Sequence, residues 1–165
     1  MSPVIDELEV LIGTTLWLHR QQWEITAISI PRRNGTVVTE RLEAFRSRIA
    51  AAGVTYRREP QFFSDGPDIV ATRGDTEWKI ECKGLGTGAK STLFTQFQRG
   101  VGSVVSYFDG PTVRLGLSLP EEYLFDHKWG RRLPRQFRQA CNLWVLAYSE
   151  GEIFAHKPDS ELPPD

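Results

Sequence analysis

Apolar side chains recur at the three- and four-residue spacing of an α-helix in several parts of the chain. Residues 4–20 and 91–108 each carry such a stripe, and residues 39–52 carry a third that ends at Gly53. A stripe of this kind marks a helix that buries one face against a sheet or another helix. A shorter helix is predicted over residues 134–141.

Stretches with alternating or β-branched apolar residues predict strands between these helices. They lie at residues 54–57, in the two arms of a hairpin at 67–83, at 113–119, and in a second hairpin at 143–156. Residues 23–30 fit either a strand or a helix. Helices that alternate with strands in this order indicate an α/β fold, with a mixed central sheet flanked by helices.

The chain is expected to form a single domain over residues 1–157, since one hydrophobic core suffices at this length. Residues 1–35 are interpreted as an accessory N-terminal helical segment that packs on the domain or forms a dimer contact. Residues 158–165 are acidic and rich in proline, so we predict a mobile tail there.

Composition changes this picture little. The 165 residues are 40% apolar and 25% charged, with a net charge of −1, so any surface for nucleic acid must be local. Cys82 and Cys141 lack the spacing of a metal site and are expected to be reduced core residues. Neither a secretory signal nor a membrane span is apparent, and a cytoplasmic protein with no membrane partner is the expectation.

The hairpin at 67–83 carries the candidate chemistry. Side chains alternate along a strand, so Glu81 and Lys83 share one face while Cys82 points to the other. Asp68 enters the neighbouring strand directly after a proline, where strand propensity gives no reason for an acid. Two carboxylates suit Mg²⁺, and an ammonium beside them suits a phosphate. The alternative is the solvated face of an amphipathic strand, with ion pairs across the hairpin.

Residues 36–108 resemble the core of the PD-(D/E)XK nuclease superfamily, which includes restriction endonucleases and archaeal Holliday-junction resolvases. The resemblance rests on a glutamate-bearing helix that ends in Gly53, a strand, the pair Pro67-Asp68, the triplet Glu81-Cys82-Lys83 and a glutamine-bearing helix. It implies a restriction-endonuclease-like fold and Mg²⁺- or Mn²⁺-dependent hydrolysis of DNA. Asp68, Glu81 and Lys83 would occupy the signature positions, with Asp68 and Glu81 on the metal.

The same resemblance adds two weaker candidates. Family members often carry a metal-binding glutamate in the first helix, and Glu40 is the nearest match, although a helical wheel turns it away from the apolar stripe. The helix after the lysine often supplies a glutamine to the site. Gln96 and Gln98 flank the stripe there, and the spacing favours Gln96.

Positive charge that could follow a phosphate backbone is concentrated between residues 128 and 138. The candidates for nucleic-acid binding are Lys90, Arg131, Arg132, Arg135 and Arg138, with Lys128 beside them and Arg32, Arg33, Arg57 and Arg58 as extensions. A solvated basic face is the alternative. The expected partner is DNA, duplex or branched, although single strands and RNA stay open. A homodimer or a place in a larger complex is expected, since cutting two strands usually takes two active sites.

Two other functions compete with a nuclease. The first keeps the fold without catalysis, as a nuclease-like DNA-binding or scaffold subunit. The second uses residues 84–91, which follow a strand, open a helix and resemble a phosphate-binding P-loop. Ala89 stands there in place of the glycine before Lys90, and backbone could not come as close to a phosphate.

Overall fold

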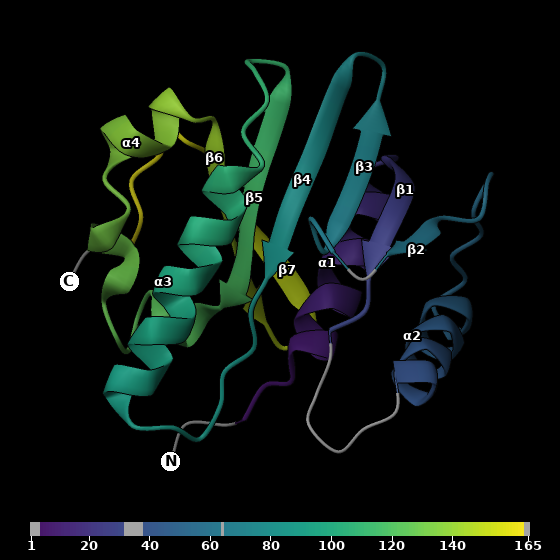
Figure 1. The fold of residues 1–165 in the computed structure, drawn as a ribbon, viewed down its shortest axis with the longest axis horizontal. Coiled ribbons are helices and arrows are strands. Elements are labelled where there is room, and N and C mark those ends of the chain that lie inside the picture. The colour runs from purple at the N-terminus through teal and green to yellow at the C-terminus, as the bar shows by residue number, and fades with distance from the viewer. Residues whose placement is uncertain (1–3, 32–37, 64, 164–165) are drawn as a thin grey trace.

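The computed structural model describes residues 4–31, 38–63 and 65–163 (Figure 1). Its helices are α1 (Glu7–Arg20), α2 (Val38–Ala51), α3 (Lys90–Ser106) and α4 (Arg135–Ala140), with short 3-10 helices η1 (Glu121–Tyr123) and η2 (Trp129–Arg132). Its strands are β1 (Glu24–Ser29), β2 (Gln61–Phe63), β3 (Ile69–Arg73), β4 (Thr76–Cys82), β5 (Val113–Pro120), β6 (Leu143–Ser149) and β7 (Glu152–His156).

Across these residues the strands form one seven-stranded mixed sheet in the order β2-β1-β3-β4-β5-β6-β7. The pairs β1/β2, β4/β5 and β5/β6 are parallel, and β1/β3, β3/β4 and β6/β7 are antiparallel. The expected α/β fold with a mixed sheet flanked by helices is thus confirmed. So are the hairpins β3–β4 and β6–β7.

The sheet separates two hydrophobic cores. Figure 1 shows α3 across the near face and α1 across the far face. Trp78, Ile80 and Cys82 of β4 point into the core that α1 and α2 cover. There Trp78 packs edge-on against Trp17, Trp23 and Trp144, with ring centroids 5.9, 6.0 and 5.3 Å apart. Glu81 and Lys83 therefore lie on the other side of β4, as the alternation predicted.

The N-terminal segment differs from the expectation of an accessory element. Helix α1 covers the sheet directly, and β1 pairs with β2 on one side and with β3 on the other. Residues 23–30, which fitted strand or helix, supply β1, since Ile25, Ala27 and Ile28 are all buried there. The first 35 residues therefore include integral parts of the fold. Arg32 and Arg33, which we named as extensions of the basic region, lie outside the described residues.

The strand expected at residues 54–57 is wrong. That stretch forms no regular element, and the short edge strand β2 follows it instead. Val54 accounts for the apolar signal, because it is buried where α2 ends and its N–H donates to the Ile49 carbonyl group at 3.2 Å. Gly53 allows this reversal with a φ of +76°.

Arg138 ties the C-terminal residues to the domain. Its side chain is 1% exposed, and its guanidinium group donates to the carbonyl oxygens of Leu133, Lys157 and Ser160 at 3.0, 2.8 and 2.6 Å. Leu162 packs against the core under α3. Two expectations are corrected here. Residues 158–163 are held in place, and Arg138 is occupied by backbone carbonyl groups instead of being open to nucleic acid.

We expect Arg138→Leu to lower the free energy of unfolding by about 1–2 kcal/mol, because one buried and two partly buried hydrogen bonds to carbonyl groups would be lost. Urea denaturation measures this change, and limited proteolysis should show earlier cleavage after residue 156. Arg135→Leu is the matched control, since Arg135 makes only an exposed ion pair with Glu161 at 3.0 Å, worth little in water. Equal stability of the two variants would contradict this role for Arg138.

Candidate active site

The start of α1 and the end of β4 meet at one edge of the sheet. Ile5 and Leu85 form an antiparallel bridge, in which each N–H donates to the other carbonyl group at 2.9 and 2.8 Å. Gly84 makes this contact possible, because a Cβ atom there would lie 2.5 Å from the Ile5 carbonyl oxygen and 2.6 Å from the Glu7 nitrogen. Only glycine fits at position 84, and the close approach of the two backbone segments places Glu7 beside Lys83.

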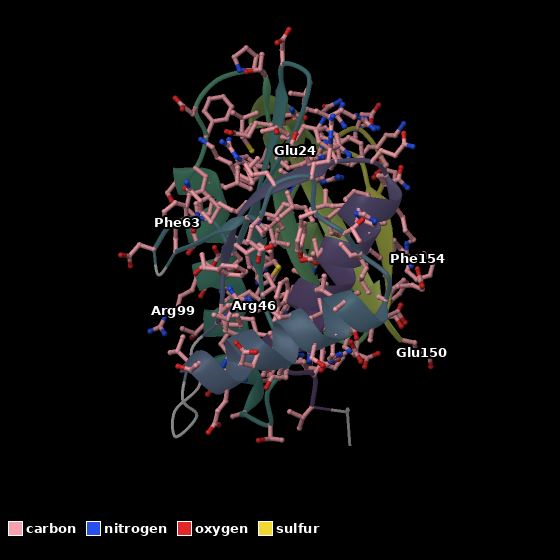
Figure 2. All side chains as sticks on the ribbon, turned by 90° about the vertical axis from the view of Figure 1, so that its right-hand side faces the viewer. Glu24, Arg46, Phe63, Arg99, Glu150 and Phe154 are labelled. Atoms are coloured by element: carbon pink, nitrogen blue, oxygen red, sulfur yellow. The ribbon has the colours of Figure 1, made fainter. Side chains whose placement is uncertain are left out.

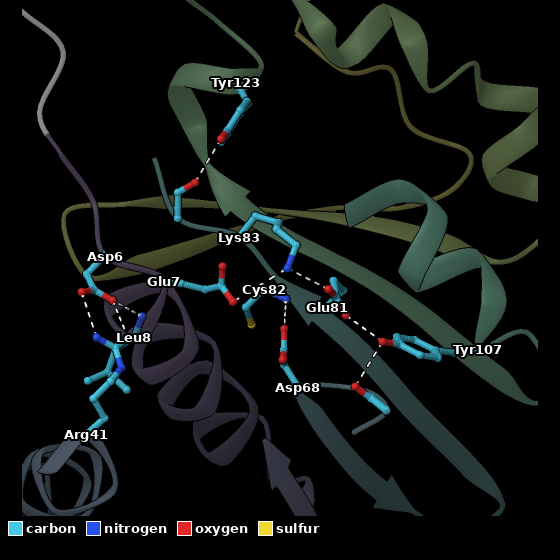
Figure 3. Close-up of polar contacts among 12 residues, drawn as sticks. Asp6, Glu7, Leu8, Arg41, Asp68, Glu81, Cys82, Lys83, Tyr107 and Tyr123 are labelled. Atoms are coloured by element: carbon cyan, nitrogen blue, oxygen red, sulfur yellow. Dashed lines mark hydrogen bonds and ion pairs between the residues drawn. The ribbon is translucent and has the colours of Figure 1, made fainter. Parts of the chain in front are cut away.

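The sequence-predicted residues Asp68, Glu81 and Lys83 come together at this edge (Figure 3). The Lys83 Nζ lies 2.7 Å from Glu81 Oε1 and 3.8 Å from Glu7 Oε1. Asp68 comes directly before β3, and its Oδ2 accepts a hydrogen bond of 2.7 Å from the Cys82 N–H. We refer to Glu7, Asp68, Glu81 and Lys83 as the acid–lysine cluster.

Tyr107, directly after α3, completes the surroundings of Glu81. Its hydroxyl oxygen lies 2.8 Å from Glu81 Oε2 and 3.1 Å from the Gly66 carbonyl oxygen, so one proton serves two acceptors. Figure 3 shows how Tyr107 joins the glutamate to the turn that precedes Asp68. Both oxygens of Glu81 are therefore engaged, one by Lys83 and the other by Tyr107.

The cluster contains three carboxyl groups and one ammonium group, and the pKa values of several of these groups are shifted. Burial, followed by the charge of Glu81, raises the pKa of Asp68 from 3.8 to about 8, although the Cys82 hydrogen bond and Lys83 oppose this shift. Burial also raises the pKa of Glu7, against the effect of Lys83. Burial alone would lower the pKa of Lys83, but the carboxylates of Glu7 and Glu81 outweigh it and raise that pKa. Lys83 is therefore charged, and the raised pKa of Asp68 keeps a proton on its carboxyl group at neutral pH while no cation is bound.

The donor set is chemically suited to a hard divalent cation. Among the residues that the structure describes, no group of three or more His, Cys, Asp or Glu side chains is arranged to hold a metal ion. Mg²⁺ is commonly held by only one or two carboxylates together with water and phosphate oxygens. Asp68 and Glu81 supply two carboxylates, and a cation beside them would favour the charged form of Asp68 against the burial and the Glu81 charge that raise its pKa.

The two weaker candidates fare differently. Glu40 is exposed, and α2 turns the neighbouring Arg41 toward the cluster instead. The Arg41 guanidinium group pairs with both carboxylate oxygens of Asp6 at 2.6 and 3.1 Å, and Asp6 caps α1 by accepting from the Leu8 N–H. Arg41 thus fixes the helix end that carries Glu7 and contributes no metal ligand. Glu40 does not line the cavity beside the cluster.

A cavity of about 490 Å³ opens beside the cluster. Glu7 and Lys83 line it from one side, and Gln96, Arg99 and Ser103 of α3 line it from the other. Gln98 is exposed and lies outside it. The structure therefore brings Gln96 to the site and leaves Gln98 at the surface.

Sequence reasoning missed Glu7, Arg99 and Tyr107. Glu7 has a local signal, since it follows Asp6, a good N-cap, in the first turn of a predicted helix. Arg99 and Tyr107 lie three and eleven residues after Gln96, so helical spacing puts them near the same face. A search along that face for polar residues would have found them.

The predicted basic residues do not all share one surface, but Lys128, Arg131, Arg135 and Arg138 line one cavity of about 230 Å³. Lys90 is exposed at the first position of α3, far along the helix from Tyr107. Arg131 and Arg132 belong to η2, where the Arg132 guanidinium group lies 5.6 Å from the centroid of the Phe94 ring. Arg135 pairs with Glu161, Arg138 is buried, and Arg57 and Arg58 line a different cavity.

Comparisons with protein-family models, curated proteins and solved structures find no match to this chain. Within the described residues, no helix has both the length and the apolar character needed to cross a membrane.

Proposed function

We propose that this chain is a divalent-metal-dependent nuclease of the PD-(D/E)XK type that hydrolyses phosphodiester bonds of DNA. The observation that carries the proposal is the acid–lysine cluster. It gathers the two acids and the lysine of the sequence pattern within a network of contacts between 2.7 and 3.8 Å, with an excess of carboxylates. An amphipathic surface strand would not place its acids in such a buried arrangement with a raised pKa at Asp68.

The order of the elements supports a restriction-endonuclease-like core. The pattern of helix, strand, aspartate-bearing strand, Glu-x-Lys strand, glutamine-bearing helix and strand fits α1, β1, β3, β4, α3 and β5, with α2 and β2 inserted. The core then starts at α1 instead of residue 36. Glu7, and no longer Glu40, takes the part of the first-helix glutamate.

In this proposal Asp68 and Glu81 would hold the metal, and Glu7 belongs to the same cluster through its contact with Lys83 at 3.8 Å. The chemistry that Mg²⁺ or Mn²⁺ would supply there is Lewis-acid polarisation of the phosphate and activation of a water molecule. The Lys83 ammonium group stabilises charge that develops on the phosphate and orients the attacking water. Tyr107 holds Glu81 in position through its hydroxyl group.

The two competing functions gain less support. Residues 84–91 do not form an open phosphate loop, since Leu85 is buried and its N–H and carbonyl groups bond to Ile5. A catalytically silent subunit would have the same fold, but DNA binding or scaffolding alone would not require the raised pKa of Asp68. A homodimer, or a place in a larger complex, remains part of the nuclease proposal.

We expect the protein to cleave supercoiled plasmid, branched or single-stranded DNA in the presence of Mg²⁺ or Mn²⁺, and EDTA to stop the reaction. Lys83→Ala should lower the rate by about 100-fold, because charge on the phosphate would lose its ammonium partner. Gel assays with all three DNA forms measure both effects.

Lys79→Ala is the matched control. Lys79 lies on the same face of β4, four residues before Lys83, and pairs with Glu77 and Asp109 at 3.4 and 3.6 Å. It should cut at the wild-type rate. The proposal fails if no DNA form is cut with either metal, which would favour the silent subunit, or if both lysine variants cut equally well.

A further inference from the structure

A second cavity lies at the opposite end of the sheet from the acid–lysine cluster. It measures about 700 Å³, and its walls come from the end of α1, the start of β1, the end of β3 and the connection from α2 to β2. Asp68 precedes β3 and Arg73 ends it, so an extended chain separates the two sites by roughly 17 Å. The second cavity is therefore distinct from the candidate active site.

Arginine dominates the walls of this cavity. Arg20, Arg57, Arg58 and Arg73 line it, against Glu24 as its one acidic lining residue within the described ranges. Figure 2 shows nitrogen-bearing side chains gathered around the end of the molecule where Glu24 is labelled. Such a density of guanidinium groups favours a phosphate-bearing ligand, since the planar fork matches phosphate oxygens.

Two of these arginines are fixed and two are available. Arg20 pairs with Glu152 at 2.7 Å. Arg73 donates to the Gln21 carbonyl oxygen at 2.9 Å, and its guanidinium group lies 4.3 Å from the centroid of the Trp23 ring. Arg57 and Arg58 are exposed and make no ion pair with any described residue. The last two can turn toward a ligand without breaking a contact.

A further arginine lies beside the cavity. Arg114 packs against Trp23 at 5.4 Å, and burial together with the charge of Arg73 lowers the pKa of Arg114. Tyr56 lines the cavity with its half-buried ring, and its hydroxyl group has no hydrogen-bond partner among the described residues. An aromatic face beside arginines suits the base of a nucleotide, because any base can stack there.

We propose that this cavity binds a nucleotide unit, with its phosphate at Arg57 and Arg58 and its base against Tyr56. The volume lies within the range of small-ligand sites. The nucleotide could be free or part of a nucleic-acid strand, and both sources present the same phosphate and base. This inference does not depend on nuclease activity.

The test measures binding of ADP and of a labelled 12-nucleotide single-stranded DNA, in EDTA and at low salt. Calorimetry serves for ADP and fluorescence anisotropy for the DNA. We expect at least one probe to bind, and Arg57→Gln/Arg58→Gln to weaken that binding about tenfold or more, because two charge-assisted hydrogen bonds are lost. Binding of ADP indicates a site for free nucleotide, and binding of DNA alone indicates a site for a strand.

The matched control is Arg46→Gln/Lys157→Gln, which removes two exposed charges outside the cavity. Its net charge equals that of the Arg57/Arg58 variant. It should bind like the wild type. The proposal is overturned if neither probe binds with a Kd below about 1 mM. It is also overturned if the Arg57/Arg58 variant binds as tightly as the wild type, or if the control loses affinity equally. Thermal unfolding of each variant verifies that it is folded.

Discussion

Asp68→Asn is expected to lower metal-dependent cleavage of DNA by about 1000-fold or more. The amide keeps the shape of the carboxylate and an oxygen that can accept from the Cys82 N–H, now 2.7 Å from Asp68. It removes the negative charge that would hold a divalent cation against the phosphate. The loss should appear in the rate with saturating Mg²⁺ and persist with Mn²⁺.

The same substitution should make the metal-free protein more stable, because a buried carboxyl group crowded by Glu81 is replaced by a neutral amide. A loss of activity joined to a gain of stability separates a functional role from a structural one. Asp75→Asn is the control, since Asp75 lies exposed in the turn between β3 and β4. If Asp68→Asn cut DNA at the wild-type rate, Asp68 would have no part in the reaction.

The second large effect is a fall in stability with rising pH in the absence of metal. The pKa of Asp68 is raised from 3.8 to about 8 in the folded protein. Between these values the folded state binds more protons than the unfolded state, so the free energy of unfolding decreases as the pH increases. The raised pKa of Glu7 acts in the same direction.

Each pKa unit corresponds to about 1.4 kcal/mol, and four units set an upper limit near 6 kcal/mol. Relaxation of the cluster and coupling to Lys83 reduce this limit, and we expect a fall of about 3 kcal/mol between pH 4 and pH 8. Urea denaturation in EDTA at a series of pH values measures it. Asp68→Asn should flatten the dependence, and so should added Mg²⁺. Identical slopes for the variant and the wild type would contradict the origin at Asp68.

Local patterns predicted the helices and the catalytic-looking hairpin well, for a physical reason. A helix or strand at a buried interface repeats its apolar residues at the period of its own backbone, and α1, α3, β4 and β5 all do so. The alternation along β4 was enough to place Glu81 and Lys83 on one face. Val54 misled the same reasoning, because one residue buried at a helix end resembles the start of a strand.

The parts that escaped prediction depend on contacts between distant residues. Glu40 was chosen as the nearest match to the first-helix glutamate of the resembled family, yet the acid beside Lys83 is Glu7 of α1, which the bridge between Ile5 and Leu85 holds there. Arg138 was predicted to be a surface charge, since nothing in the neighbouring sequence reveals that the carbonyl oxygens of Lys157 and Ser160 accept hydrogen bonds from it. The hydrophobic pattern of a sequence predicts which face of a helix or strand is buried, but it does not predict which other element packs against that face.

The close approach at Gly84 also bears on the order of events during folding. Ile5 and Leu85 are eighty positions apart, counted from residue 5 to residue 85, and Arg41 reaches back to Asp6 over thirty-five. Contacts of such separation cost loop-closure entropy and tend to form late. The contact between Glu7 and Lys83 is therefore expected to form late in folding. A partly folded chain would carry Asp68, Glu81 and Lys83 without Glu7 beside them, so the complete acid–lysine cluster would exist only in the folded domain.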